Sequence, residues 1–288
     1  MVVRSDRCGF FIVEIPTMIS PPFDQIVTLR ARLPQGLNEP SDFAQFNRQL
    51  TRAAPGFRLQ PQTPELLQDE LSFEARIAEL GVIATRPGSL HDFYSALMWL
   101  RYPRVKQAIN AIHMQGIREH GVKQRSRHQQ AVTHLDEAGA WIFSDSDALL
   151  ELADQHAWEP LFWQQAQAWR CQSELGSIRA AVFGHAIYEL MHAPHQTLAA
   201  KTIWVKVSSD FFELDVAEQD LALDSCIATA LLAGTHGNDP KPLATLPVSG
   251  IPGWNARTGE QEFYRNAPCF RGKPPGRIYS QALRLLGR

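Results

Sequence analysis

Strand-like and helical segments alternate between residues 130 and 233, and this alternation constrains the fold more than any other feature of the sequence. Apolar patterning predicts strands at residues 178–183 and 202–207 and helices at residues 184–192 and 216–233. Residues 131–143 read as two short strands around an acidic turn, or as one strand with a bulge. Alternating elements of this kind favour an α/β fold with a partly parallel sheet.

The first half of the chain has mainly helical spacing. We expect helices at residues 41–53, 63–80 and 91–102, and a fourth that opens at Pro103 and ends near Gly121. A further helix is expected at residues 145–156, with Ser144 as its N-cap. The prediction is therefore an α/β protein, with α+β as the alternative, in which a helical N-terminal half packs on a small mixed sheet.

Proline spacing divides the chain into three parts. Eight prolines fall between positions 16 and 64, and each removes a backbone donor and disfavours helix just before it. We therefore expect a wrapping arm at residues 1–65, a single α/β domain at residues 66–275, and a C-terminal tail at residues 276–288.

Charge and cysteine usage exclude several classes of protein. The formal net charge of −2 gives no whole-protein field that would attract nucleic acid or an anionic membrane. The four cysteines, Cys8, Cys171, Cys226 and Cys269, lie far apart and form no zinc-ribbon spacing, so reduced thiols are expected. Neither a secretory signal nor an apolar run long enough to cross a bilayer is found, which predicts a cytoplasmic protein without membrane contact.

His91 and Asp92 stand at the expected start of a helix. A carboxylate is favoured there by the exposed amides and the positive end of the helix dipole. One interpretation is a capping acid beside a partly buried histidine. The functional interpretation is a catalytic base with its orienting carboxylate, or a pair of metal ligands.

Three polar residues share one face of the following helix. Lys106, Asn110 and His113 are spaced four and three apart, so their side chains point the same way. With Arg104 at the start of this helix, they could bind an anionic or carbonyl-bearing substrate, and His113 is a candidate catalytic group. The alternative is a solvated polar face.

Two further sets of residues are candidates for metal binding or catalysis. Asp136 and Glu137 follow an apparent strand, where carboxylates often line a ligand crevice, although the same residues suit an ordinary turn. His185 and Glu189 lie one helical turn apart and can share a divalent metal or form a structural hydrogen bond. We take Asp136 as a catalytic candidate and assign His185, Glu189 and Asp136 as candidate metal ligands.

Charge is segregated in the middle of the chain. Residues 101–127 hold seven Lys or Arg residues and one acid, whereas residues 136–159 hold seven acids and no Lys or Arg. Two oppositely charged faces explain this pattern. The alternative is a phosphate-binding segment that includes Lys123, Arg125 and Arg127.

Several of these segments together resemble the bacterial domain-of-unknown-function family numbered 3025. The matching segments are FEARI at 73–77, HDFYSALMWLRYPR at 91–104, LDEAG at 135–139, FGHAIYE at 183–189 and LPVSGIPGW at 246–254. The resemblance implies family membership and supplies no activity.

The functional hypothesis is a metal-assisted hydrolase or transferase that acts on a small anionic molecule. A divalent metal is the candidate cofactor, and the candidate residues from distant parts of the chain would have to share one pocket. The alternative is a protein that binds nucleic acid or another partner through residues 101–127, which predicts steeply salt-dependent binding.

Overall fold

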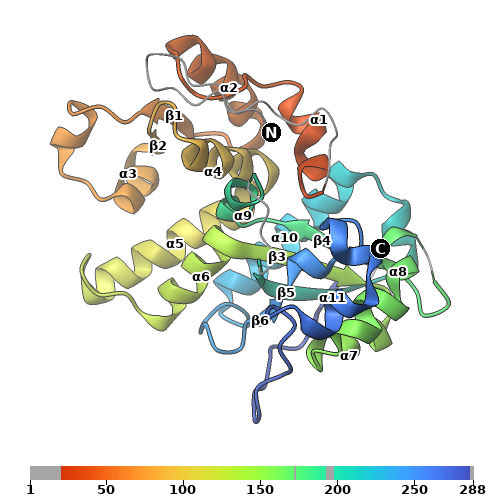
Figure 1. Cartoon of the computed structure of the whole chain (residues 1–288). Helices are drawn as coiled ribbons and strands as arrows, with labels where there is room; N and C mark the ends of the chain where they lie inside the picture. Colours follow the sequence, from red (N-terminus) through yellow and green to blue (C-terminus); the bar gives the residue numbers. More distant parts are fainter. Residues whose placement is uncertain (1–20, 172, 193–197, 286–288) are drawn as a thin grey trace.

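The computed structural model describes residues 21–285 except 172 and 193–197 (Figure 1). Cys8, the first part of the expected arm and the last three residues of the expected tail lie outside these residues. The α-helices are α1 Val27–Arg30, α2 Pro40–Ala53, α3 Phe73–Leu80, α4 Leu90–Arg101, α5 Pro103–His120, α6 Arg127–Ala138, α7 Asp147–Asp154, α8 Ala166–Arg170, α9 His185–Leu190, α10 Val216–Leu232 and α11 Gln261–Asn266. The strands are β1 Arg58–Pro61, β2 Val82–Thr85, β3 Gly139–Ser144, β4 Ile178–Val182, β5 Ala200–Val207, β6 Ala244–Leu246 and β7 Leu283–Leu285.

The larger of the two sheets has five strands and is mixed, as the sequence predicted. Its strands follow the order β4-β3-β5-β6, and β7 pairs with the far end of β5. β3 runs parallel to β5, and β5 parallel to β7, while the pairs β3–β4 and β5–β6 are antiparallel. Every residue of β3 is buried, as expected of a central strand that is covered on both faces.

A second sheet, which the sequence reading missed, lies beside the helices of the N-terminal half. β1 and β2 pair in parallel, with α3 in the connection between them. Asn47 of α2 fixes the position of β1, because its side chain exchanges two hydrogen bonds with the backbone of Leu59, at 2.8 and 3.0 Å. In Figure 1 this unit lies at the upper left, above α5 and α6, whereas α7, α8 and α11 lie towards the lower right.

The prediction for residues 131–143 was wrong. Arg127–Ala138 is a helix, opened by a capping box between Ser126 and Gln129, and only Gly139–Ser144 is a strand. Ala131, Val132 and Leu135 are buried along one face of this helix. Asp136 and Glu137 therefore lie in the last turn of α6, immediately before the central strand.

Two smaller predictions also need correction. Ser144 ends β3, and the N-cap of α7 is Ser146, whose hydroxyl accepts a hydrogen bond from the amide of Leu149 at 3.3 Å. The helix predicted at residues 63–80 is interrupted, with a short 3-10 turn at Leu66–Asp69 before α3. Gly81 ends α3 in the left-handed conformation, as expected of a C-terminal glycine.

A buried ion pair fixes the corner between α4 and α5 to α10. The guanidinium of Arg101 donates to both carboxylate oxygens of Asp220, at 2.6 and 2.9 Å, and the hydroxyl of Tyr102 donates to the same carboxylate at 2.5 Å. This contact holds the helices that carry the candidate residues against the rest of the core. Among the described residues, no helix is both long and apolar enough to span a membrane.

Candidate functional site

Three helix ends meet on one side of the larger sheet and carry the candidate residues. α4 packs against α9, and α9 packs against α6. His91 lies in the first turn of α4, Glu137 in the last turn of α6, and His185 is the first residue of α9. Each side chain therefore projects from a helix end into the same space.

Gly184 allows α9 to begin close to the end of α6. The amides of Phe183 and Gly184 both donate to the carbonyl of Gly139, at 3.0 and 2.8 Å. A Cβ at position 184 would lie only 2.3 Å from the amide nitrogen of Gly139. Glycine is therefore required for this close approach, and the approach brings His185 next to Glu137.

His91, Glu137 and His185 form a cluster suited to a metal ion. Their ligand atoms all lie within 4.8 Å of one another. The Nε2 atoms of the two histidines are 2.9 Å apart, and Nε2 of His185 is 3.5 Å from Oε2 of Glu137. Two nitrogens on one tetrahedral zinc ion lie about 3.3 Å apart, given Zn–N bonds of about 2.0–2.1 Å. A small outward rotation of the rings would produce that geometry.

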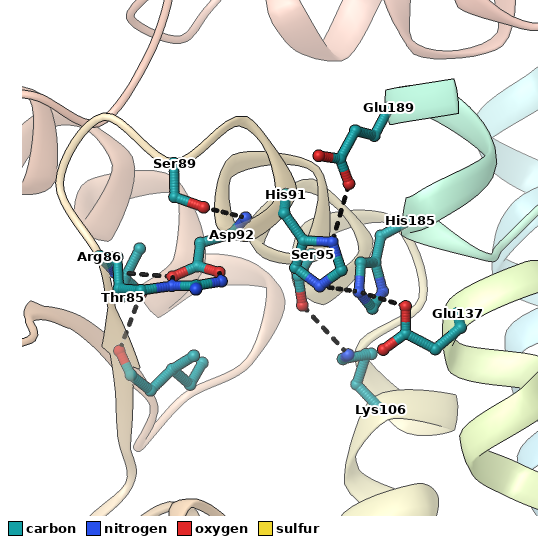
Figure 2. A network of polar contacts seen from close by, with 11 residues as sticks. Thr85, Arg86, Ser89, His91, Asp92, Ser95, Lys106, Glu137, His185 and Glu189 are labelled. Atoms are coloured by element: carbon teal, nitrogen blue, oxygen red, sulfur yellow. Dashed lines mark hydrogen bonds and ion pairs between the residues drawn. The ribbon is translucent and has the colours of Figure 1, made fainter. Parts of the chain in front are cut away.

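A carboxylate lies behind the imidazole ring of His91, as Figure 2 shows. Nδ1 of His91 is 2.9 Å from Oε2 of Glu189, on the side of the ring away from His185. Nδ1 of His185 is 3.9 Å from Oδ1 of Asp136, too far for a hydrogen bond, and this buried nitrogen has no hydrogen-bond partner among the described residues. At His91, a carboxylate that receives the Nδ1 proton leaves the Nε2 lone pair free for a cation, which is the usual arrangement around metal-bound histidines.

Burial sets the protonation state of the deepest member of the cluster. The side chain of His185 is only 4% exposed, whereas that of Glu137 is 47% exposed. Burial lowers the pKa of His185 to about 4, although the charge of Asp136 opposes that shift. The ring of His185 is therefore neutral at pH 7, which is the form that binds metals.

A cavity of about 490 Å³ opens beside this cluster. Its size falls within the range of small-molecule sites. Residues from β2, α3, α4, α5, α6 and α9 line it, together with the loop before α6. The charged or titratable lining residues are Glu74, Arg86, His91, Asp92, His113, Arg125, Asp136, Glu137 and His185.

Two acids of the cavity are held by cations of the protein itself. Asp92 accepts two hydrogen bonds from the guanidinium of Arg86, at 2.7 and 3.0 Å, and its amide is capped by Ser89 (Figure 2). Burial alone would raise the pKa of Asp136, but the Lys106 ammonium, 2.6 Å away, holds that pKa below its ordinary value. Both carboxylates are therefore ionised at neutral pH.

Glu74 is a different kind of carboxyl. Burial raises its pKa to about 7, although the Asn110 amide, which donates to its Oε2 atom at 2.5 Å, opposes that shift. Asn110 also donates to the backbone carbonyl of Glu74 at 2.9 Å and so fixes its position. A carboxyl that titrates near pH 7 can both give and take a proton under neutral conditions.

The structure brings together most of the residues proposed from sequence. His91, Asp92, His113, Asp136 and His185 all line the cavity. Three others lie around it: Lys106 pairs with Asp136, Asn110 holds Glu74, and Glu189 contacts His91. Burial lowers the pKa of His113 to about 4, and its Nε2 atom lies 3.5 Å from the Thr133 hydroxyl.

Arg104 lies elsewhere. It lines a separate cavity between α5 and α10, and its backbone amide donates to Asp224 at 3.0 Å. Four charged residues of the main cavity were not assigned as site residues from the sequence: Glu74, Arg86, Arg125 and Glu137. The sequence analysis had named Arg125 and Glu137 without assigning them to this site. The capping box at Ser126 could have identified α6 as a helix, and Glu137 would then have been placed at its end.

The basic segment at residues 101–127 is partly neutralised by the protein. Arg101 pairs with Asp220, Lys106 with Asp136, and Arg127 with Asp239. Of these pairs, Lys106–Asp136 joins the basic segment to the acidic segment at residues 136–159. Three of the positive charges of this segment are therefore paired with acids of the protein itself.

These features define an α/β protein with a His–Glu–His cluster beside a polar cavity. A family model for a protein of unknown function, DUF3025, matches residues 60–274. The chain belongs to this family, as the sequence motifs predicted. Comparisons with curated proteins and with solved structures found no match.

Proposed function

We propose that the cavity is the active site of a metal-assisted hydrolase that acts on a small anionic substrate. The observation that carries this proposal is the meeting of His91, Glu137 and His185, from three separate helix ends, with all ligand atoms within 4.8 Å. Two imidazoles and one carboxylate are a common ligand set for a catalytic zinc ion, which keeps a fourth position open. A divalent metal in such a site lowers the pKa of water and polarises the bond under attack.

The side chains around the cluster fit the assignment of ligands. Glu189 stands behind His91 and orients its ring, while Asp136 is bound to Lys106, so direct ligation is left to Glu137. Lys106 neutralises Asp136, and this pairing keeps that carboxylate away from a cation bound by its neighbour. Glu189 thus has a positioning role in this proposal, the side chain of Asp136 acts on His185 through its negative charge alone, and His185 keeps its role as a ligand.

Arg125 and Glu74 would supply the substrate-binding charge and the proton donor. Arg86 is bound to Asp92, whereas no ion pair of Arg125 with an acid is found among the described residues, so Arg125 is suited to bind the negative charge of a substrate. Glu74 would pass a proton to the leaving group as water adds and the bond to that group breaks. Its pKa of about 7 keeps a substantial protonated fraction at neutral pH.

Metal binding is the first test. Protein purified without a histidine tag and treated with chelator should bind one Zn²⁺ or Mn²⁺ per chain in calorimetry and gain thermal stability. His91→Ala and Glu137→Gln should each lower the affinity more than 100-fold, because removing even an orienting partner of a metal ligand costs about 10–100-fold. Both side chains are partly exposed, so the variants should still fold.

His120→Ala is the matched control, because His120 is an exposed histidine at the end of α5 and is not one of the three clustered residues. Its metal affinity should equal that of the wild type. Binding of less than one ion per chain, or equal losses in all three variants, would end the proposal.

A further inference from the structure

A third cavity, lined by residues of β5, β6 and the segment 268–279, has an unusual balance of charge. It has a volume of about 550 Å³ and shares no lining residue with the metal-site cavity. Four cationic side chains line it: Lys201, Lys241, Arg271 and Arg277. The described lining includes no aspartate or glutamate, so these positive charges face a space without a compensating acid.

The acids nearest to this cavity in the sequence are bound elsewhere. Asp154 pairs with Lys273 at 2.5 Å, and Glu159 pairs with Arg265. Asp239 pairs with Arg127, but it also accepts a hydrogen bond from the backbone amide of Lys241 at 2.7 Å and offsets part of the Lys241 charge. The four lining cations make no ion pair within 4.0 Å of an acid among the residues that the structure describes. The charges of Lys201, Arg271 and Arg277 therefore remain available to a ligand, and that of Lys241 remains so in part.

Hydrogen bonds hold these cations in place around the cavity. The Lys201 ammonium donates to the Thr245 hydroxyl at 3.1 Å, which links β5 to β6. The Arg277 guanidinium donates to the carbonyl of Lys241 at 3.0 Å and so holds two of the cationic residues together. Burial, aided by the charge of Arg277, lowers the pKa of Lys201. Like charges held this close repel one another, and an anion between them would relieve the repulsion.

A rigid aromatic wall supports the loop that carries Arg271. The indole nitrogen of Trp158 donates to the Arg271 carbonyl at 2.7 Å, and His156 lies 3.2 Å from the same oxygen. His156 also stacks on Tyr279, with ring centroids 5.5 Å apart and an interplanar angle of 11°. His156 has a positive φ of 56°, a conformation that costs energy in a non-glycine residue and that clusters at functional sites.

We propose that this third cavity binds a small molecule that carries two or more phosphate groups. Four cationic residues in the lining of one cavity match several negative charges, and a concave site of this volume fits a small molecule better than an extended strand. The formal net charge of −2 gives no whole-protein field that would attract nucleic acid. The site is independent of the metal cluster, so either assignment can fail alone.

Calorimetry with sodium tripolyphosphate as the probe tests this proposal. The full-length wild type should bind one tripolyphosphate per chain, more tightly than orthophosphate, and the affinity should fall as salt is added. Lys241→Gln and Arg277→Gln should each weaken binding about tenfold, because each removes a charge-assisted hydrogen bond. Lys241 is exposed, so its variant should fold even if Arg277→Gln disturbs the loop.

Arg48→Gln is the matched control, because it removes one positive charge from an exposed position on α2, which does not line the cavity. It should bind tripolyphosphate as the wild type does. Equal losses in this control, or no loss in Lys241→Gln, would show that only surface charge is involved. A short single-stranded oligonucleotide that binds more tightly than tripolyphosphate, and that weakens in the same variants, would overturn the small-molecule assignment.

Discussion

The Glu74 carboxyl should make the stability of this protein depend on pH in a measurable way. Burial raises its pKa from 4.5 to about 7. The folded protein therefore binds this proton more tightly than the unfolded chain does. Its stabilising contribution is complete below pH 4.5 and is lost as the pH rises through 7. The difference between the pKa of Glu74 in the unfolded chain and in the folded protein is equivalent to about 3 kcal/mol of folding free energy.

Glu74→Gln isolates this contribution, since glutamine keeps the shape and can still accept the hydrogen bond from Asn110. Urea unfolding of both proteins at pH 5 to 8, with chelator present, gives the difference between their free energies of unfolding. Relative to Glu74→Gln, the wild type should lose about 2.5 kcal/mol between pH 5 and pH 8 by linkage. The comparison cancels the other groups that titrate in this range.

A second measurement separates the pKa from any packing change. Carbon-detected NMR of the Glu74 carboxyl group in the wild type should give a titration midpoint near 7. A midpoint near the ordinary value of 4.5, together with a stability difference that stays constant with pH, would refute the reasoning. Glu74 could then not serve as a proton donor at neutral pH.

Three further changes test the site and its supports. Glu189→Gln should lower metal affinity about 10–100-fold without changing the unfolding temperature of the metal-free protein, because Glu189 contacts His91 from behind; unchanged affinity would remove its positioning role. Arg101→Met should cost about 3–5 kcal/mol in urea unfolding, because it leaves the Asp220 carboxylate buried without its partner; a loss below 1 kcal/mol would contradict this. Gly184→Ala should lower the unfolding temperature strongly and abolish metal binding, since its Cβ would meet backbone at 2.3 Å; normal metal binding would show that the helix start can move.

Elements whose signals are local were predictable from the sequence. α2, α4, α5, β4, β5 and α10 lie within a few residues of their predicted positions, because proline, glycine and apolar spacing mark them directly. Pro103 separates α4 from α5, and Gly81 ends α3. The small mixed sheet also followed from the alternation of strands and helices.

Elements that depend on contacts with distant residues were missed. β1 is only four residues long, and its position is fixed by Asn47 of α2 and by pairing with β2. No periodicity in so short a segment distinguishes a strand from a loop. At residues 131–143 the apolar residues Trp141 to Phe143 correctly indicate a strand, but the predicted strand region also included residues 131–138, which are helical.

The choice between Asp136 and Glu137 shows most clearly what a sequence leaves open about this site. Neighbouring residues on a helix point about 100° apart, because each turn holds 3.6 residues. Asp136 consequently contacts Lys106 on α5, whereas Glu137 reaches towards His185 on α9. The two acids have nearly the same chemistry, so only the packing of three helices decides which of them lies beside the histidines. The same packing places Glu189, one turn along α9 from His185, against Nδ1 of His91. The sequence predicted Glu189 as a metal ligand beside His185.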